Sequence, residues 1–85
     1  MNIDIKDTIT LNDDNEYVVV SKVLYKNDIY YYIVDKNNHS NIKFCIEKYE
    51  NNSILEIENK VLIQELLPLF FEASKGYISE LLEEN

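Results

Sequence analysis

The sequence predicts an α+β domain in which a five-stranded antiparallel β-meander is followed by one kinked C-terminal helix or two short helices. Apolar and polar residues alternate with a period of two as far as about residue 57, and the period then lengthens to that of a helix. Polar, turn-forming runs divide the first part into strand-sized pieces. The 85 residues contain no linker rich in Gly, Pro or Ser and no internal repeat, so we expect a single domain over residues 1–85.

The first strand is expected at Thr8–Leu11, where Ile9 and Leu11 alternate with two threonines. Residues 12–15, Asn-Asp-Asp-Asn, supply a turn, because these side chains hydrogen-bond to their own backbone. The second strand is expected from about Glu16 to Tyr25, a segment rich in β-branched residues.

The other strands follow in the same way. A tight hairpin turn is expected at Lys26-Asn27-Asp28, because the apolar pattern resumes immediately after these polar residues. The remaining elements are a third strand at Ile29–Asp35, a polar loop at 36–41, a fourth strand at Ile42–Glu50, a turn at Asn51-Asn52 and a fifth strand at Ser53–Ile57.

Beyond Asn59 the apolar residues recur at helical spacing and predict one buried stripe. Asn59 is the expected N-cap. Pro68 lacks an amide proton, so it is expected to kink the helix or to start a second one, and Gly76 weakens the helix further. The stripe consists of Ile63, Leu66, Leu67, Phe70, Tyr77, Ile78 and Leu81.

The charge of the chain restricts what it binds. There are 16 acidic residues against 8 basic ones, all of them lysine, which gives a net charge of -8. Nucleic-acid binding depends on clustered Lys or Arg that neutralise phosphates, so direct binding to nucleic acid is disfavoured. The expected partner is instead a protein with a basic surface.

The sequence offers little to catalysis. The only histidine, His39, lies in a polar loop, and Cys45 lies in an apolar alternation, so neither is expected to act as base or nucleophile. Asp13, Asp14 and Glu16 lack the ligand spacing of a calcium loop, and the single glycine excludes a glycine-rich phosphate loop. We therefore predict a non-enzymatic protein with no metal and no cofactor.

The expected location is the cytoplasm of a bacterial cell or of a phage-infected host. A lone cysteine cannot form an internal disulfide, which fits a reducing compartment. The first residues alternate apolar with charged side chains and do not form a secretory signal, and the longest apolar run, Leu66 to Phe71, is too short to span a membrane.

The third strand carries large apolar side chains on both faces. Tyr30, Tyr32 and Val34 fall on one face, and Ile29, Tyr31 and Ile33 on the other. One helical layer covers only one face of a sheet. Either the helix wraps around the sheet edge, or tyrosines remain half exposed with their hydroxyls in water, or the uncovered face meets another chain.

These observations predict a protein-binding module that blocks or modulates a partner with a basic surface. It would do so by competing for the basic site of that partner, for example by imitating a phosphate backbone. The acidic C-terminus also serves solubility without any partner. The alternative is a housekeeping bacterial protein, homodimeric through the uncovered sheet face. The expected partner-binding residues are Asp13, Asp14, Glu16, Tyr30, Tyr32, Glu80, Glu83 and Glu84.

Three segments carry a resemblance to a known family: residues 7–17, residues 26–31 and Ile57-Glu58-Asn59 at the start of the helix. With their acidic turn, aromatic hairpin and closing helix, they resemble a family of small acidic proteins of low-GC Gram-positive bacteria, classed as a domain of unknown function. This resemblance implies no activity, cofactor or catalytic residue. By type alone, the chain is also similar to small acidic phage-encoded inhibitors of bacterial defence, including anti-CRISPR proteins.

Overall fold

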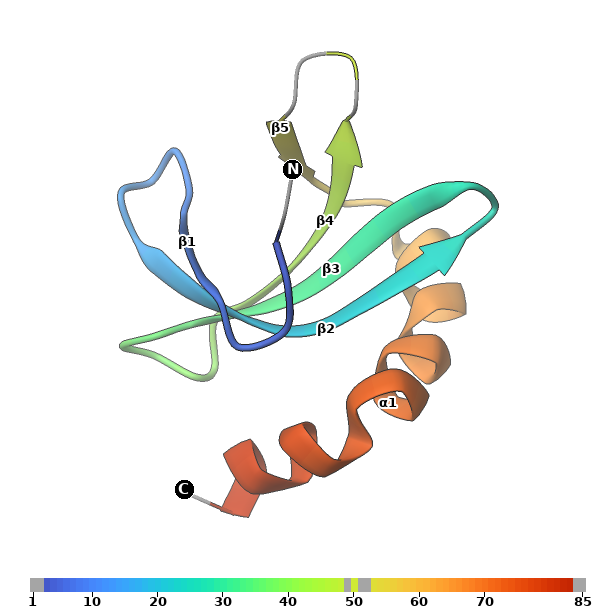
Figure 1. Cartoon of the computed structure of the whole chain (residues 1–85). Coiled ribbons are helices and arrows are strands. Elements are labelled where there is room, and N and C mark those ends of the chain that lie inside the picture. The colour runs from blue at the N-terminus through green and yellow to red at the C-terminus, as the bar shows by residue number, and fades with distance from the viewer. Residues whose placement is uncertain (1–2, 49, 51–52, 84–85) are drawn as a thin grey trace.

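Five strands and one helix follow one another along the chain. They are β1 (Thr8–Thr10), β2 (Glu16–Tyr25), β3 (Asp28–Asp35), β4 (Ile42–Lys48), β5 (Ser53–Glu56) and α1 (Lys60–Glu83). Neighbouring strands are antiparallel, and their order in the sheet is their order in the chain, so the predicted meander with a C-terminal helix is confirmed (Figure 1). The computed structural model describes residues 3–48, 50 and 53–83, with side chains as far as Tyr77.

The β2–β3 hairpin closes through a two-residue loop. Lys26 and Asn27 have φ angles of 50° and 71°, as the two central residues of a type I′ turn require. The backbone twist of this turn matches the right-handed twist of the flanking strands. The predicted tight turn is thus confirmed, with Asp28 already belonging to β3.

A β-bulge in β2 decides which side chains face the helix. Val19 pairs with Ile33 and Ser21 pairs with Tyr32, so Val20 is an extra residue on this strand. Beyond the bulge Ser21 therefore lies on the same face as Tyr32. Its buried hydroxyl donates a hydrogen bond of 2.9 Å to the backbone carbonyl of Phe70 in α1.

The helix covers one face of the sheet (Figure 1). Leu66 and Phe70 of α1 are fully buried against Val20, Tyr30, Tyr32 and Val34. The ring of Tyr32 lies at the centre of this core, with ring centroids of Phe44 at 5.2 Å and of Phe70 at 5.8 Å in edge-to-face geometry. The predicted helical stripe is correct at Leu66, Leu67, Phe70 and Tyr77, while Ile78 and Leu81 lie outside the described side chains.

The opposite face is also buried, so the expectation of an uncovered sheet face is wrong. Tyr17, Val19, Tyr31, Ile33 and Cys45 form a second core there. The sheet curls strongly, and this brings both edge strands and the N-terminal segment over the same face (Figure 1). Four isoleucines and one leucine close the core: Ile3, Ile9, Leu11, Ile29 and Ile54.

The helix begins and bends at identifiable residues. The side-chain oxygen of Asn59 accepts hydrogen bonds from the amides of Val61 and Leu62, which confirms the predicted N-cap. Pro68 lies inside the helix, and the residue with non-helical backbone angles is Ser74, with φ of -139° and ψ of 32°. The expected bend exists, but it lies six residues after Pro68.

Candidate functional site

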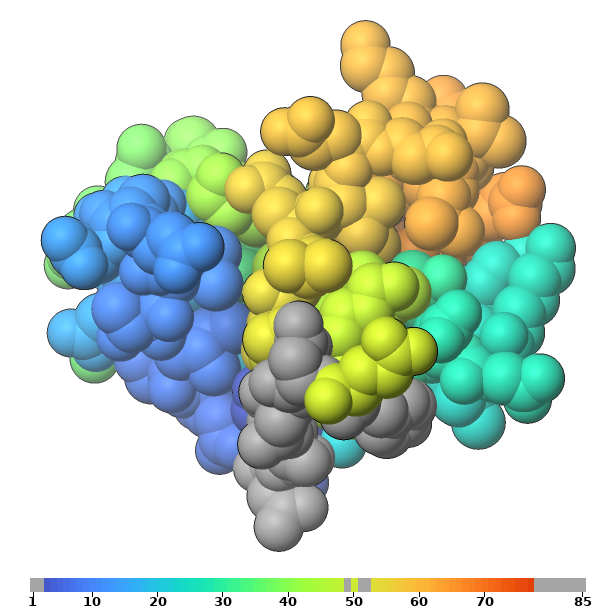
Figure 2. Space-filling model, turned by 90° about the horizontal axis from the view of Figure 1, so that it is seen from above, coloured from blue at the N-terminus to red at the C-terminus, as the bar shows by residue number. Residues whose placement is uncertain are grey.

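A groove separates the two edge strands of the curled sheet. It has a volume of about 570 Å³, within the range typical of ligand pockets. In Figure 2 the blue surface of the N-terminal part and the yellow surface of β5 lie on the same face of the molecule. The groove is lined by Ile3, Ile9, Thr10, Leu11, Asn12, Asp13, Lys43, Ser53, Ile54, Leu55 and Glu56.

The interior of the groove is apolar because of strand alternation. Ile9 and Leu11 point to the same face of the sheet as Tyr17, and Ile54 lies opposite Glu47 on that face. These side chains belong to the second core and also line the groove. Leu55 points the other way and is 49% exposed. The groove is thus an opening into one of the two cores of the protein.

Charged side chains line one part of the groove. The ammonium of Lys43 in β4 lies 3.1 Å from a carboxylate oxygen of Glu56 in β5. The hydrogen bond to Glu56 is the main reason that the pKa of Lys43 is raised, and the nearby negative charge of Asp13 adds to it. Among the described residues that line the groove, two carboxylates, Asp13 and Glu56, thus share this wall with one cation, Lys43.

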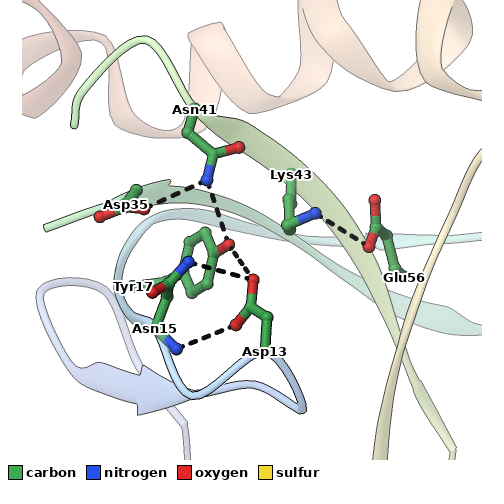
Figure 3. Close-up of polar contacts among 7 residues, drawn as sticks. All are labelled: Asp13, Asn15, Tyr17, Asp35, Asn41, Lys43 and Glu56. Carbon is green, nitrogen blue, oxygen red and sulfur yellow. Dashed lines mark hydrogen bonds and ion pairs between the residues drawn. The ribbon is translucent and has the colours of Figure 1, made fainter. Parts of the chain in front are cut away.

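Asp13 is held in place by a polar network that joins two loops (Figure 3). The buried hydroxyl of Tyr17 donates a hydrogen bond of 2.7 Å to Asp13, and the side-chain amide of Asn41 donates to the same hydroxyl at 3.2 Å. Asn41 also donates to Asp35 at 3.1 Å, and the backbone amide of Asn15 donates to Asp13 at 3.0 Å. The β1–β2 turn is therefore fixed to the β3–β4 loop.

The network favours the ionised form of both of its carboxyl groups. The hydrogen bond from Tyr17 is the main reason that the pKa of Asp13 lies below its usual value. The pKa of Asp35 is lowered mainly by the backbone amide of Asn37 and then by the side chain of Asn41. Burial, followed by the bond to Asp13, raises the pKa of Tyr17. At neutral pH the groove wall keeps its negative charge at Asp13.

The predicted acidic residues of the first turn lie beside the groove. Asp13 lines it, Asp14 is exposed next to it with a φ of 63°, and Glu16 is exposed at the start of β2. The carboxylate of Glu16 lies 3.8 Å from the ammonium of Lys36. The structure thus brings these three predicted residues together on one turn.

The predicted tyrosines do not join them. Tyr30 is 5% exposed and Tyr32 is 8% exposed, because both point toward α1 and pack in the helix-side core. Burial raises the pKa of each hydroxyl. The expectation that these side chains offer an exposed aromatic surface is therefore wrong. Glu80, Glu83 and Glu84, the other predicted partner-binding residues, lie outside the described side chains.

Several groove residues were not predicted from the sequence. Lys43, Ile54 and Glu56 come from β4 and β5, far along the chain from the acidic turn. Alternation places Ile54 and Glu56 on the same face as Cys45 once β5 is paired with β4. No sequence signal indicates how strongly the sheet curls, and the curl is what brings β5 close to β1.

Two other reactive groups, Cys45 and His39, are not among the residues that line the groove. Cys45 is a fully buried free thiol, and burial raises its pKa to about 12. His39 is exposed in the β3–β4 loop. Within the part of the chain that the structure describes, His, Cys, Asp and Glu side chains form no group of three that could hold a metal ion.

The described helix is not a membrane span, since it is not both long and apolar enough to cross a bilayer. Comparison with protein-family models, with curated proteins and with solved structures finds no significant match for this chain.

Proposed function

We propose that this chain is a small non-enzymatic binding module that docks on a basic surface of another protein and thereby blocks or modulates it. The observation that carries this proposal is the groove between β1 and β5, which combines an apolar interior with the carboxylates of Asp13 and Glu56. Interfaces commonly pair an apolar centre with complementary charge at the rim, and this groove offers both.

The overall charge supports a cationic partner. A net charge of -8 on 85 residues attracts basic proteins over several ångströms and repels polyanions. The sharper form of the proposal is that the partner surface is a nucleic-acid-binding site, where lysines and arginines already accept negative groups. A phage-encoded inhibitor of a bacterial defence protein is one setting that fits these properties.

The proposed setting is the cytoplasm. The single cysteine is a free, buried thiol rather than half of a disulfide, as is usual in reducing compartments. The alternative of a homodimer through an open sheet face has lost its basis, because both faces of β3 are buried.

The test compares two variants that remove the same amount of charge. Asp14→Asn with Glu56→Gln neutralises one carboxylate next to the groove and one that lines it, and Asp28→Asn with Glu72→Gln neutralises two at the β2–β3 hairpin and on α1. Each tagged protein is used to capture binding proteins from bacterial lysate at 50 and 500 mM NaCl, and captured proteins are identified by mass spectrometry and re-tested in purified form.

The groove variant is expected to bind a purified basic partner roughly tenfold more weakly than the unmodified protein, because exposed charge pairs contribute up to about 1 kcal/mol each. The control variant should bind nearly as well as the unmodified protein, and high salt should weaken all binding. Equal losses in both variants, or capture of acidic partners only, would contradict the proposal.

A further inference from the structure

The two strands that flank the groove each have one edge that no other described strand covers. In an antiparallel pair, successive residues of a strand direct their backbone N–H and C=O groups alternately toward the partner strand and away from it. The edge groups that point into the groove can therefore be identified from the register.

On β5 the outward-pointing residues are Ile54 and Glu56. The amide of Ile57 donates a hydrogen bond of 2.7 Å to the carbonyl of Phe44, so this pair occupies a hydrogen-bonded position of the antiparallel register. When this alternation is continued along the register, the backbone N–H and C=O groups of Leu55 and Ser53 point toward β4. Ile54 and Glu56 then direct their amides and carbonyls to the free edge, and both line the groove.

On β1 the outward-pointing residues are Thr8 and Thr10. Leu11 donates to the carbonyl of Asn15 and Val19 donates to the carbonyl of Asp7, which leaves these threonines in the alternate positions of the register. Their side chains lie on the face away from Ile9 and Leu11, whereas those of Ile54 and Glu56 point inward. The β5 edge is therefore the better docking edge.

We infer that the groove binds an extended segment of a basic protein, which pairs with β5 as an additional strand. This inference rests on the proposed function and specifies its recognition mode. In strand addition, main-chain hydrogen bonds provide affinity and the pockets for alternate side chains provide specificity. Ile54 and Glu56 offer both kinds of contact at one edge.

The groove also indicates the sequence of the segment. A strand paired with β5 places side chains i and i+2 on the same face, opposite Ile54 and Glu56. The side chain opposite Ile54 must be apolar, because Ile54 belongs to the same core as Ile9 and Leu11. The side chain opposite Glu56 is a lysine or arginine, because the two negative charges of Glu56 and Asp13 outnumber the one positive charge of Lys43 in this wall.

The test uses the hexapeptide Thr-Val-Thr-Lys-Thr-Val, acetylated and amidated at its ends. Amide hydrogen exchange of the full chain is followed by NMR with and without the peptide at 50 mM NaCl. Exchange at Ile54 and Glu56 should slow at least about tenfold on saturation, because their amides gain partners. Leu55, whose amide points to β4, should change little.

Two matched controls separate strand pairing from charge attraction. A peptide methylated on alternate backbone amides keeps its side chains and charge but cannot form the ladder, so it should not bind. A peptide with Glu in place of Lys should bind at least tenfold more weakly. In the protein, Glu56→Gln should weaken binding, whereas the distant substitution Glu72→Gln should not.

Three results would overturn the inference: equal binding of the methylated peptide, unchanged exchange at Ile54 and Glu56, or protection of these amides already in the free protein. None of them contradicts docking by charge, which the capture experiment measures separately. A different outcome is that the groove variant captures basic proteins as well as the unmodified protein does while the hexapeptide still pairs with β5. That result would support strand addition at β5 and would contradict the proposal that a basic protein docks through the groove carboxylates.

Discussion

At the scale of single residues, burial decides which chemistry is accessible. Cys45 is fully buried between Tyr31 and Glu56 in the strand register, and its pKa is raised to about 12, first by desolvation. The reactive form of a cysteine is the thiolate. At neutral pH this thiol is therefore almost entirely protonated and shielded from solvent.

We predict that Cys45 does not react with a thiol reagent in the folded protein. Incubation with an excess of 5,5′-dithiobis(2-nitrobenzoic acid) at pH 8 should release chromophore only after denaturant is added, because the folded thiol is buried and protonated. Stoichiometric labelling within minutes in native buffer would show that the second core is open to solvent.

The network at Asp13 and Asp35 makes a second residue-scale prediction. The pKa of each carboxyl is below its usual 3.8 in the folded chain, so the unfolded chain binds protons more readily. The two carboxylates contribute their full stabilisation at pH values above the pKa of the unfolded chain, about 3.8. This contribution is lost as the pH falls toward their lower pKa values in the folded chain.

The double variant Asp13→Asn with Asp35→Asn should consequently show a shallower loss of stability below pH 4 than the unmodified protein. Urea denaturation followed by circular dichroism between pH 6 and 2.5 measures this slope. Parallel curves for the two proteins would mean that the network does not favour the ionised carboxylates.

At the scale of the elements, the strands were predictable and the bend of the helix was not. The expected second strand, Glu16–Tyr25, matches β2, and the expected third strand differs from β3 by one residue. The period of two and the polar turns carry this information. The bend was expected at Pro68, yet the backbone there stays helical and deviates at Ser74.

A physical reason for this difference lies in exposure. Pro68 removes only the hydrogen bond to the carbonyl of Gln64, and both residues are on the exposed side of the helix, where water can solvate that carbonyl. Ser74, in contrast, is buried. A sequence pattern identifies residues that disfavour a helix. It does not show at which of them water can solvate the unpaired backbone group and so leave the helix unbent.

Gly76 lies in the helix after this bend, and it supports a stability prediction. A Cβ atom added there would have no heavy atom within 4 Å, and the glycine does not have a positive φ. Gly76→Ala should therefore stabilise the protein by about 0.5–1 kcal/mol through helix propensity. Thermal denaturation measures the change, and a lower melting temperature would indicate that Gly76 is not helical in solution.

The hairpin turn offers a further prediction at this scale. Asn27 has a φ of 71°, which glycine adopts without steric cost. Asn27→Gly should stabilise the hairpin by a few tenths of a kcal/mol up to about 1 kcal/mol. Leu24→Gly in the adjacent strand serves as the contrasting variant and should destabilise it. Urea midpoints of the two variants would show opposite shifts.

At the scale of the whole molecule, the curl of the sheet was the feature that sequence could not provide. Alternation correctly assigns Tyr30 and Tyr32 to one face and Tyr31 and Ile33 to the other. It does not determine the curvature that covers the second face with Ile9 and Ile54. The acidic turn lies at the groove, and its role in partner binding stays a prediction, whereas the tyrosines that were expected to be exposed are buried.

The net charge makes a prediction about the molecule as a whole. Sixteen acidic and eight basic residues leave -8, and the repulsion among them is stronger in the compact folded state than in the expanded chain. Raising NaCl from 20 to 500 mM at pH 7 should increase the free energy of unfolding by about 1 kcal/mol. Differential scanning calorimetry would detect the higher melting temperature, and a decrease would show that attractive ion pairs outweigh the repulsion.

The extra residue in β2 has a consequence for how such a molecule can diversify. Removing Val20 would leave Val19 opposite Ile33 and Ser21 opposite Tyr32, so each remaining side chain would keep its orientation. What would change is the local twist that this insertion adds. The bulge thus links the shape of the sheet to the packing of the helix, because a deletion that relaxes the twist also removes Val20, a buried side chain of the helix-side core.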